Sequence, residues 1–290
     1  MNKFCLVANM EKHNAADVAD SICRYLSERN CFCKIIPNRC QEIDGCKFYS
    51  DLNEIPRGTQ CIIVLGGDGT MIQAARDTSK LGIPLHGINI GGVGFLTESE
   101  TDGMWNSIDK LISDDFKVET RMMLEGFVVE DGRKKTDYAL NDFVVAKREL
   151  GKLIRFEVCI NGEMLDSFFA DGVIVSTPTG STGYNLSAGG PVISPEINAL
   201  VVTPICPHSL NDRSFVIDGN DEVEIRLLEG KNSHLDSAVI SVDGRVFEVI
   251  ESGSILRMKK ASLVTKIIHM EKTNFYHKMR SKLSIGGKTD

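Results

Sequence analysis

The run Gly66-Gly67-Asp68-Gly69-Thr70 is the segment whose residue types and spacing best suit chemistry. It follows the apolar stretch 61–65 and precedes a helical pattern, and ligands of parallel α/β sheets bind at the carboxyl ends of strands. Glycines there let backbone N–H groups approach phosphate oxygens closely. A carboxylate repels phosphate, so we expect Asp68 to meet a hydroxyl group or take its proton. The alternative is an Asp-Gly turn that only caps the next helix.

A second glycine-rich segment, residues 89–96, follows the next predicted strand. Two adjacent glycine loops at strand ends outline one cleft. Within this segment Gly92-Val93-Gly94 could open the dinucleotide fingerprint G-x-G-x-x-G, but Thr97 stands where the third glycine belongs. An ordinary nicotinamide-dependent dehydrogenase is therefore disfavoured.

The densest concentration of polar residues lies in residues 170–195. An apolar strand, 173–176, runs into a loop with six Ser or Thr residues between Ser176 and Ser187. Tyr184 and Asn185 in this loop can stack on and hydrogen-bond to a ligand. The composition predicts a binding loop for a polar, aromatic ligand. The alternative is a solvated, turn-rich segment.

The first 115 residues alternate strand and helix patterns, which builds a parallel sheet covered by helices. Apolar runs predict strands at 4–8, 33–36, 61–65 and 84–90. Helical spacing predicts one helix capped by Asn14 and ending near Asn30, a second over 71–80, and a third around 104–112. The predicted fold is an α/β N-terminal domain, residues 1–115, with a parallel sheet.

From residue 116 onward, short β-rich runs are separated by turn signals such as Asp131-Gly132 and Asn161-Gly162. This texture predicts an antiparallel, β-rich C-terminal domain over residues 116–270. Strands are expected at 126–130, 142–146, 154–160, 173–176, 201–204, 222–228, 238–242 and 263–268. Apolar residues at helical spacing over 274–283 predict a docking helix within a C-terminal tail, 271–290.

Composition narrows the classes of partner. The 290 residues are 42% hydrophobic and 25% charged, with a net charge of -7, which fits a soluble globular chain and disfavours nucleic acid and anionic membranes. No apolar stretch has the roughly 18 residues that a membrane-spanning helix needs, and we expect a cytoplasmic protein. The nine cysteines lack paired CxxC spacing, so reduced thiols are expected. A metal or redox site at Cys31, Cys33, Cys40 and Cys46 is the alternative.

Taken together and in order, these motifs resemble those of the NAD kinase family over about residues 1–270. The matching segments are Gly66 to Thr70, Asn89 to Leu96, Asn141-Asp142, Asp171 to Pro195, the run Thr203 to Leu210, and Val242-Asp243-Gly244. The first motif alone is similar to one shared with diacylglycerol and sphingosine kinases and, more loosely, phosphofructokinases. The Ser-Thr-Pro-Thr-Gly-Ser-Thr-Gly-Tyr run is far more restrictive.

The resemblance implies transfer of the γ-phosphoryl group of ATP, or of another phosphoryl donor, to the 2'-hydroxyl of the adenosine ribose of NAD. It also implies a divalent metal ion, Mg²⁺ by preference, that accompanies the nucleotide, and an active site between the domains. Asp68 matches the proposed general base. Substrate contacts are implied for Gly69, Asn141, Asp142, Asp171, Thr182, Gly183, Tyr184, Asn185, Leu186 and Ser187.

Several positions depart from the family pattern. Gln73 and Phe169 stand where many members carry a basic residue, and Arg245 stands where Gln is frequent. Phosphate charge would then be met by Lys152, Arg155, Arg245 or metal. For Arg245, an exposed turn role is the alternative. His208, Asp212, Asp218 and Asp243 are expected to be structural.

The resemblance further implies a homodimer or homotetramer, in which the adenine loop meets a neighbouring subunit. Two other functions stay open at this stage. A lipid kinase of the diacylglycerol type would share the Asp68 motif, although the acidic composition and the Ser/Thr-rich loop speak against it. A non-catalytic dinucleotide sensor would bind NAD without phosphoryl transfer.

Overall fold

The computed structural model describes residues 1–38, 41–43, 46–48, 52–91, 94–97, 99–130, 132–149, 153–209, 213–229, 236–270, 275–276 and 279–280. The chain forms two compact units, one made of Met1–Thr120 with Thr265–Asp290 and the other of Arg121–Val264. The sequence placed the boundary between residues 115 and 116. The chain passes from the first unit to the second within one long strand, β8 (Lys117–Glu130).

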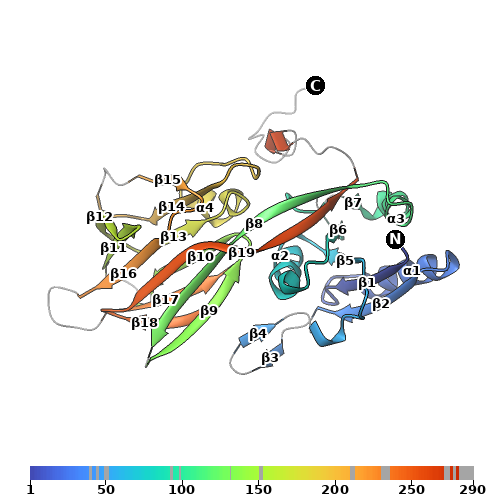
Figure 1. Cartoon of the computed structure of the whole chain (residues 1–290), viewed down its shortest axis with the longest axis horizontal. Coiled ribbons are helices and arrows are strands. Elements are labelled where there is room, and N and C mark those ends of the chain that lie inside the picture. Colours follow the sequence, from blue (N-terminus) through green and yellow to red (C-terminus); the bar gives the residue numbers. More distant parts are fainter. Residues whose placement is uncertain are drawn as a thin grey trace. The chain divides into compact units, whose positions relative to one another are not determined.

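The first unit is built on a parallel sheet in the strand order β6-β5-β1-β2 (Figure 1). Its strands are β1 (Lys3–Ala8), β2 (Phe32–Pro37), β5 (Cys61–Gly66) and β6 (Leu85–Asn89). The short strand β7 (Ser99–Glu100) and the last residues of β19 (Ile255–His269) also pair with β6 in parallel. A separate hairpin joins β3 (Gln41–Ile43) to β4 (Cys46–Phe48).

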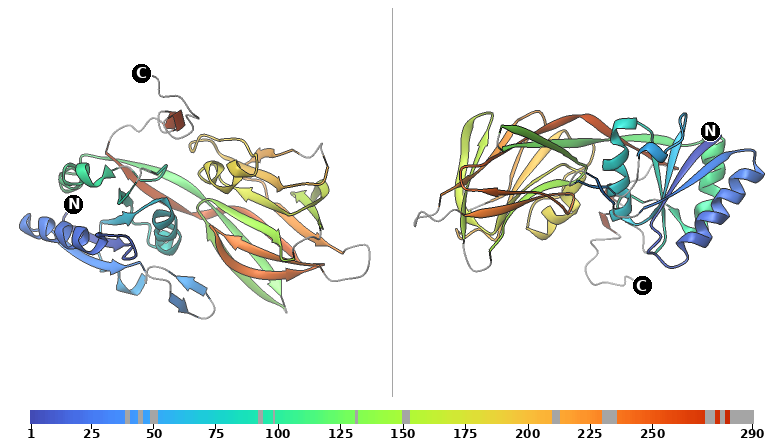
Figure 2. Two further views of the ribbon diagram at one scale, coloured as in Figure 1. Left: turned by 180° about the vertical axis from the view of Figure 1, so that it is seen from behind. Right: turned by 90° about the horizontal axis from the view of Figure 1, so that it is seen from below.

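Helices cover both faces of this sheet (Figure 2). Helix α1 (Ala15–Glu28) and helix α3 (Met104–Ile112) pack on one face, where Ile22, Ile108 and Ile63 share one buried core. Helix α2 (Asp68–Thr78) follows β5 directly. It begins three residues before the predicted start because the extended Gly67 serves as its N-cap. Three 3₁₀ turns complete the unit at Leu52–Glu54, Ser79–Leu81 and Thr101–Gly103.

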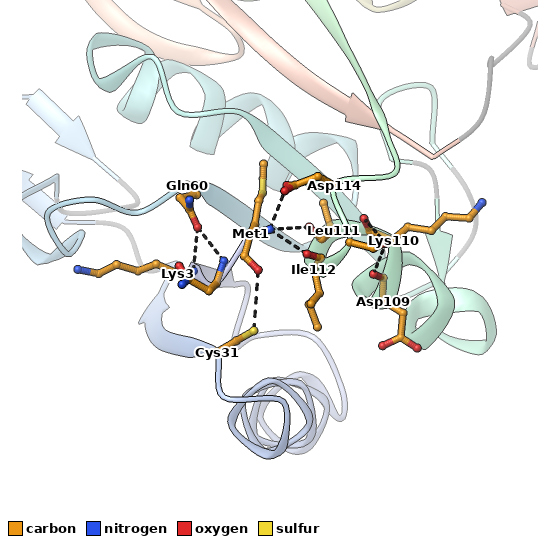
Figure 3. Close-up of polar contacts among 11 residues, drawn as sticks. Met1, Lys3, Cys31, Gln60, Asp109, Lys110, Leu111, Ile112 and Asp114 are labelled. Atoms are coloured by element: carbon orange, nitrogen blue, oxygen red, sulfur yellow. Dashed lines mark hydrogen bonds and ion pairs between the residues drawn. The ribbon is translucent and has the colours of Figure 1, made fainter.

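Polar contacts fasten the beginning of β1 to its neighbours (Figure 3). The amino group of Met1 donates to the carbonyl of Ile112 at 2.9 Å and to Asp114 Oδ1 at 3.0 Å. The side-chain oxygen of Gln60 accepts from the backbone N–H groups of Asn2 and Lys3 at 2.7 and 3.2 Å. A cation beside the last carbonyls of α3 is favourable because helix C-termini carry partial negative charge.

The second unit contains a six-stranded antiparallel sheet in the order β15-β14-β13-β10-β17-β18. Its strands are β10 (Asp142–Lys147), β13 (Gly172–Ser176), β14 (Ala199–Ile205), β15 (Phe215–Asp218), β17 (Ser237–Val242) and β18 (Arg245–Glu251). Asp142, the first residue of β10, pairs with Ser176, the last residue of β13, so these strands bring two of the sequence motifs side by side.

A second antiparallel arrangement joins β12 (Glu163–Ala170), β11 (Ile154–Ile160), β16 (Val223–Leu228) and the first part of β19 in that order. Strand β9 (Arg133–Ala139) pairs with β8. Phe156 of β11, Ile225 of β16 and Phe143 of β10 belong to one buried cluster, so the two sheets share a core. This antiparallel β unit confirms the predicted fold class.

Strands β9, β12, β15 and β18 were not anticipated from the sequence. They carry many charged or exposed residues, so pairing with a neighbouring strand, rather than apolar periodicity, makes them strands. Of the predicted helix 274–283, the residues 275–276 and 279–280 are helical, and the remainder lies outside the described residues. Among the described helices, none has the length and apolarity to cross a membrane.

Candidate active site

The Asp68 side chain is held in one orientation by backbone groups of the second glycine loop. Its Oδ2 accepts the N–H of Phe95 at 2.7 Å, and its Oδ1 accepts the N–H of Leu96 at 3.1 Å. Asp68 is half-buried at the first turn of α2, where the helix dipole favours a negative charge. Each carboxylate oxygen has about two acceptor sites. One on each oxygen therefore remains for a ligand hydroxyl.

Gly94 makes this arrangement possible. A methyl group at Gly94 would lie 2.5 Å from Asp68 Oδ2 and closer still to Oδ1. Thr97 stands where the dinucleotide fingerprint would have its third glycine, and it is fully buried. Its hydroxyl accepts the N–H of Gly94 at 3.0 Å and the side-chain N–H of Asn89 at 3.1 Å. Thr97 therefore shapes the loop through hydrogen bonds, which explains why a glycine is not needed there.

The loop after β1 contributes two residues that the sequence did not single out. The Asn9 amide donates to Thr70 Oγ1 at 3.4 Å. The Lys12 ammonium lies 4.0 Å from the point where a Cβ of Gly91 would stand, and Gly91 has a φ of +132°. Lys12 thus brings a positive charge beside the glycine loops of the first unit. An isolated lysine in a surface turn carries no spacing signal, so pattern reasoning could not find it.

In the second unit, Asp243 organises the corner that carries Asn141 and Asp142. Its carboxylate accepts the backbone N–H groups of Leu140 at 2.9 Å, Asn141 at 2.8 Å and Asp142 at 3.2 Å. Asp243 has a φ of 50° and Gly244 a φ of 76°, as the central residues of a tight hairpin turn require. Its structural role agrees with the sequence-based expectation.

Asp142 is only 5% exposed, and its carboxyl lies near a second negative charge. Burial, with a smaller contribution from Asp243, raises the pKa of Asp142 from 3.8 to about 7. The adjacent Asn141 has a buried Oδ1 without a hydrogen-bond partner among the described residues. An added Cβ at Gly183 would lie 3.5 Å from Asn141 Nδ2 and 4.0 Å from Asp142 Oδ2. The structure therefore brings Asn141, Asp142 and Gly183 together.

Most hydroxyls of the Ser/Thr-rich loop are used inside the protein. Ser176, Thr177, Thr179 and Ser181 are at most 7% exposed. For example, Thr177 Oγ1 donates to Leu140 O at 2.6 Å, and Ser181 Oγ donates to Pro178 O at 2.6 Å. The loop folds into a 3₁₀ turn, Gly180–Thr182, and the short helix α4 (Tyr184–Ser187). Residues left at the surface or half-buried are Thr182, Gly183, Tyr184, Leu186 and Ser187.

Asn185 differs from the expectation that it hydrogen-bonds a ligand. It is fully buried, and its Nδ2 donates to the carbonyls of Ser181 at 3.1 Å and Pro191 at 3.0 Å. Its Oδ1 accepts the Thr203 hydroxyl at 2.7 Å. Both N–H bonds of the amide are used, so Asn185 fixes the shape of the loop from within. Tyr184, by contrast, is 48% exposed.

Two of the predicted charged contacts, Asp171 and Arg245, form ion pairs within the protein. Lys147 Nζ lies 2.5 Å from Asp171 Oδ1, and Asp171 remains 38% exposed. Arg245 forms a close ion pair with Asp137 on β9. The two side chains are 10% and 15% exposed. Arg245 is therefore neither an exposed turn residue nor an unpaired cation for phosphate.

The remaining predicted residues are dispersed. Phe169 is 37% exposed, with the Arg155 guanidinium 5.9 Å from its ring centre. Gln73 lies half-buried on α2, and His208 is exposed. Asp218 accepts the backbone N–H of Asn220, as a turn residue would. Lys152 and Asp212 lie outside the described residues.

No group of three metal-ligating side chains occurs in the part of the chain that the structure describes. Of the suggested cysteine cluster, Cys40 and the side chain of Cys46 are outside that part. Cys31 and Cys33 are both free thiols.

The chain matches two family models over most of its length. Residues 4–116 match the ATP-NAD kinase N-terminal domain, and residues 140–270 match the ATP-NAD kinase C-terminal domain. An NAD kinase of Lachnoclostridium phytofermentans is 38% identical over 285 residues, covering 97% of this chain and 99% of that protein. One from Lachnospira eligens is 37% identical and covers 98% of this chain and 100% of the relative.

Solved structures share the fold. A yeast NADH kinase complexed with NADH has a TM-score of 0.87 at 21% identity, covering 100% of this chain and 89% of that one. An NAD kinase from Archaeoglobus fulgidus in complex with ATP has a TM-score of 0.74 at 22% identity, covering 99% and 100%. With matches of this length in both domain models, the chain belongs to the NAD kinase family, enzymes that phosphorylate NAD.

Proposed function

We propose that this protein transfers the γ-phosphoryl group of a nucleoside triphosphate to the 2'-hydroxyl of the adenosine ribose of NAD, giving NADP. The observation that carries the proposal is the oriented carboxylate of Asp68, held by the N–H groups of Phe95 and Leu96 at the end of a parallel strand. Family membership indicates the reaction, and the Asp68 carboxylate is the proposed general base for it.

Asp68 suits the role of general base. A base must be within hydrogen-bond reach of the proton that it takes, and the remaining acceptor positions on Oδ1 and Oδ2 can receive a ribose hydroxyl. The two N–H donors prevent the carboxylate from rotating away, so its orientation is settled before substrate arrives. Because phosphoryl transfer depends mainly on positioning and charge stabilisation, a pre-oriented base is an advantage.

The second unit supplies the groups for the dinucleotide. The unpartnered Oδ1 of Asn141 is an acceptor for an amine or hydroxyl. Asp142 can accept a hydroxyl when ionised or donate when protonated, since its pKa is about 7. The half-exposed ring of Tyr184 can cover a base. Gly69, Thr182, Gly183, Leu186 and Ser187 complete the proposed contacts, and Asp171 can contact the dinucleotide from its exposed side.

The phosphoryl donor is proposed to arrive with Mg²⁺. Mg²⁺ keeps several waters and binds through one or two carboxylates plus substrate phosphates rather than in a dedicated protein cage. We propose that the donor phosphates and water supply most of the ligands, and no group of three metal-ligating side chains occurs among the described residues. When bound, the metal ion neutralises phosphate charge. The Lys12 ammonium near Gly91 adds a protein cation for the same task.

The test is a coupled assay for NADP formation with purified protein, NAD, ATP and Mg²⁺, alongside an NAD-binding titration. Asp68→Asn keeps the shape of the side chain but cannot take a proton, so turnover is expected to fall by roughly 10²- to 10⁴-fold with NAD binding largely retained. Turnover near that of the wild type in this variant would remove Asp68 from the mechanism.

The same experiment separates the two alternative functions. NAD binding without NADP formation in the wild type would favour a dinucleotide sensor. Phosphorylation of diacylglycerol but not of NAD would favour a lipid kinase, although the relatives that align over the whole chain are NAD kinases. The homodimer or homotetramer and the cytoplasmic location stay predictions, and light scattering on the purified protein tests the first.

A further inference from the structure

Two cysteines of the first unit lie unusually close together. The sulfur of Cys23 on α1 is 2.7 Å from the sulfur of Cys33 on β2. Ordinary non-bonded carbon contacts are about 3.5 to 4.0 Å, whereas a disulfide bond is about 2.05 Å. Both residues are free thiols and half-buried. The two sulfurs are therefore in direct contact, as a hydrogen-bonded pair of thiols.

Local chain geometry explains why the pair meets. Helix α1 ends at Glu28, Asn30 takes a left-handed conformation with a φ of 58°, and the chain returns as β2. Cys23 and Cys33 both pack against the core that α1 shares with the sheet. Helix α1 packs directly on β2, so a bond between the sulfurs would join neighbouring elements and close a short loop.

The neighbouring cysteines are less suited to exchange. Burial raises the pKa of Cys5 to about 12 and also raises that of Cys61, so both remain thiols. The Cys31 sulfur faces the Met1 carbonyl at 3.9 Å rather than another sulfur (Figure 3). The hydrogen bond between the paired thiols lowers the pKa of Cys23 and raises that of Cys33. Since the thiolate is the attacking species, Cys23 is the group prepared to react first.

We propose that Cys23 and Cys33 form a thiol–disulfide exchange site that reacts with low-molecular-weight disulfides such as glutathione disulfide. The Cys23 thiolate attacks one sulfur of the disulfide, which forms a mixed disulfide and releases one glutathione thiolate that takes up a proton. The Cys33 thiol then loses its proton, attacks the Cys23 sulfur and releases the second glutathione. Overall, the two protein thiols are oxidised to one disulfide, and glutathione disulfide is reduced to two thiols.

This site is separate from the proposed chemistry at Asp68. Cys33 is the second residue of β2, near the amino end of the parallel sheet, whereas Asp68 follows the carboxyl end of β5. The proposal therefore does not depend on the kinase mechanism. Kinase activity serves only to show that each protein sample is native.

The experiment equilibrates the reduced full chain with glutathione buffers of increasing oxidised fraction. After acid quenching and alkylation, peptide mass spectrometry locates the modified cysteines. We expect a peptide that links Cys23 to Cys33, a loss of two alkylatable thiols, and full reversal by dithiothreitol. Closing a loop lowers the entropy of the unfolded chain, so the unfolding midpoint of the oxidised chain is expected to rise. The loop is short, so the rise should be modest, roughly 5 °C.

Matched variants identify the pair. Cys23→Ser and Cys33→Ser are each expected to lose the internal link and to carry glutathione on the cysteine that remains. Cys33→Ser, which keeps Cys23, should be glutathionylated more readily than Cys23→Ser, which keeps Cys33. Cys206→Ser removes an exposed cysteine outside the pair and should keep the link. Mass-spectrometric mapping of the modified cysteines in the wild type needs no variant. It therefore tests the proposed Cys23–Cys33 link even if a substitution prevents folding. Glutathione on other cysteines without a Cys23–Cys33 link, or a link between other cysteines, would overturn the proposal.

Discussion

Substitution of Gly94 by Ala tests whether the orientation of Asp68 limits catalysis. The added methyl group would overlap the Asp68 carboxylate, lying 2.5 Å from Oδ2 and closer to Oδ1. The three atoms nearest to that methyl group all belong to the Asp68 carboxyl group. The perturbation therefore acts mainly on the Asp68 side chain.

The expected fall in the free energy of unfolding follows from the two hydrogen bonds that Asp68 would lose. To make room, Asp68 must give up the N–H groups of Phe95 at 2.7 Å and Leu96 at 3.1 Å. A hydrogen bond to a charged group contributes about 1.5 to 3 kcal/mol, and water can replace part of this because Asp68 is only half-buried. We expect the free energy of unfolding to fall by about 1 to 3 kcal/mol. Turnover should fall by roughly 10²-fold or more, as for a displaced general base.

The assay combines NADP formation with urea unfolding. Gly103→Ala is the control, because a methyl group there meets no atom within 4 Å. If Gly94→Ala acts through Asp68, the double variant with Asp68→Asn should be no slower than Asp68→Asn alone, since coupled changes are not additive. Wild-type turnover in Gly94→Ala, or additive losses in the double variant, would refute this reasoning.

Three further substitutions have measurable consequences. Tyr184→Ala should weaken NAD binding more than ATP binding, because the half-exposed ring can cover a base; equal changes in two calorimetric titrations would contradict this. Arg245→Gln should lower the free energy of unfolding by about 3 to 5 kcal/mol but leave both Michaelis constants unchanged, because Arg245 is paired with Asp137; a raised Michaelis constant with unchanged stability would instead indicate a phosphate contact. Asp142→Asn should change the pH dependence of stability. Burial raises the pKa of Asp142 from 3.8 to about 7, so the folded protein binds this proton more tightly than the unfolded chain, and wild-type stability falls by up to about 4 kcal/mol as pH rises through this interval. The variant should lack that fall, and parallel urea-unfolding curves against pH would contradict the assignment.

The position of Asp68 could be predicted from sequence because its signals are local. An apolar run, a glycine turn and a helical pattern follow one another within about twenty residues, and the ends of parallel strands are known ligand sites. Its hydrogen-bond donors could not be predicted. They are backbone groups of Phe95 and Leu96, and no residue type marks a backbone N–H that will point at a carboxylate from another loop.

The Ser/Thr-rich loop shows what composition cannot resolve. Its hydroxyls indicated a polar ligand, yet Ser176, Thr177 and Ser181 are buried and bonded to backbone groups of the protein. A hydroxyl that closes a turn and one that meets a ligand look alike in a sequence, because each can donate and accept. Only the three-dimensional neighbours distinguish them, and here they leave Thr182, Tyr184 and Ser187 as the outward-facing members.

Asp243 illustrates how a residue of a family motif can act by ordering the backbone of other motif residues. A buried polar corner is costly unless its backbone groups are satisfied, and one carboxylate satisfies three N–H groups about one hundred residues earlier in the chain. The same negative charge also helps to raise the pKa of Asp142. Asp243 therefore holds the backbone of Asp142 in place and adds, after burial, to the rise of the pKa of Asp142. If Asn141 and Asp142 bind the dinucleotide as proposed, a change at this turn is expected to alter that binding through the backbone of these two residues.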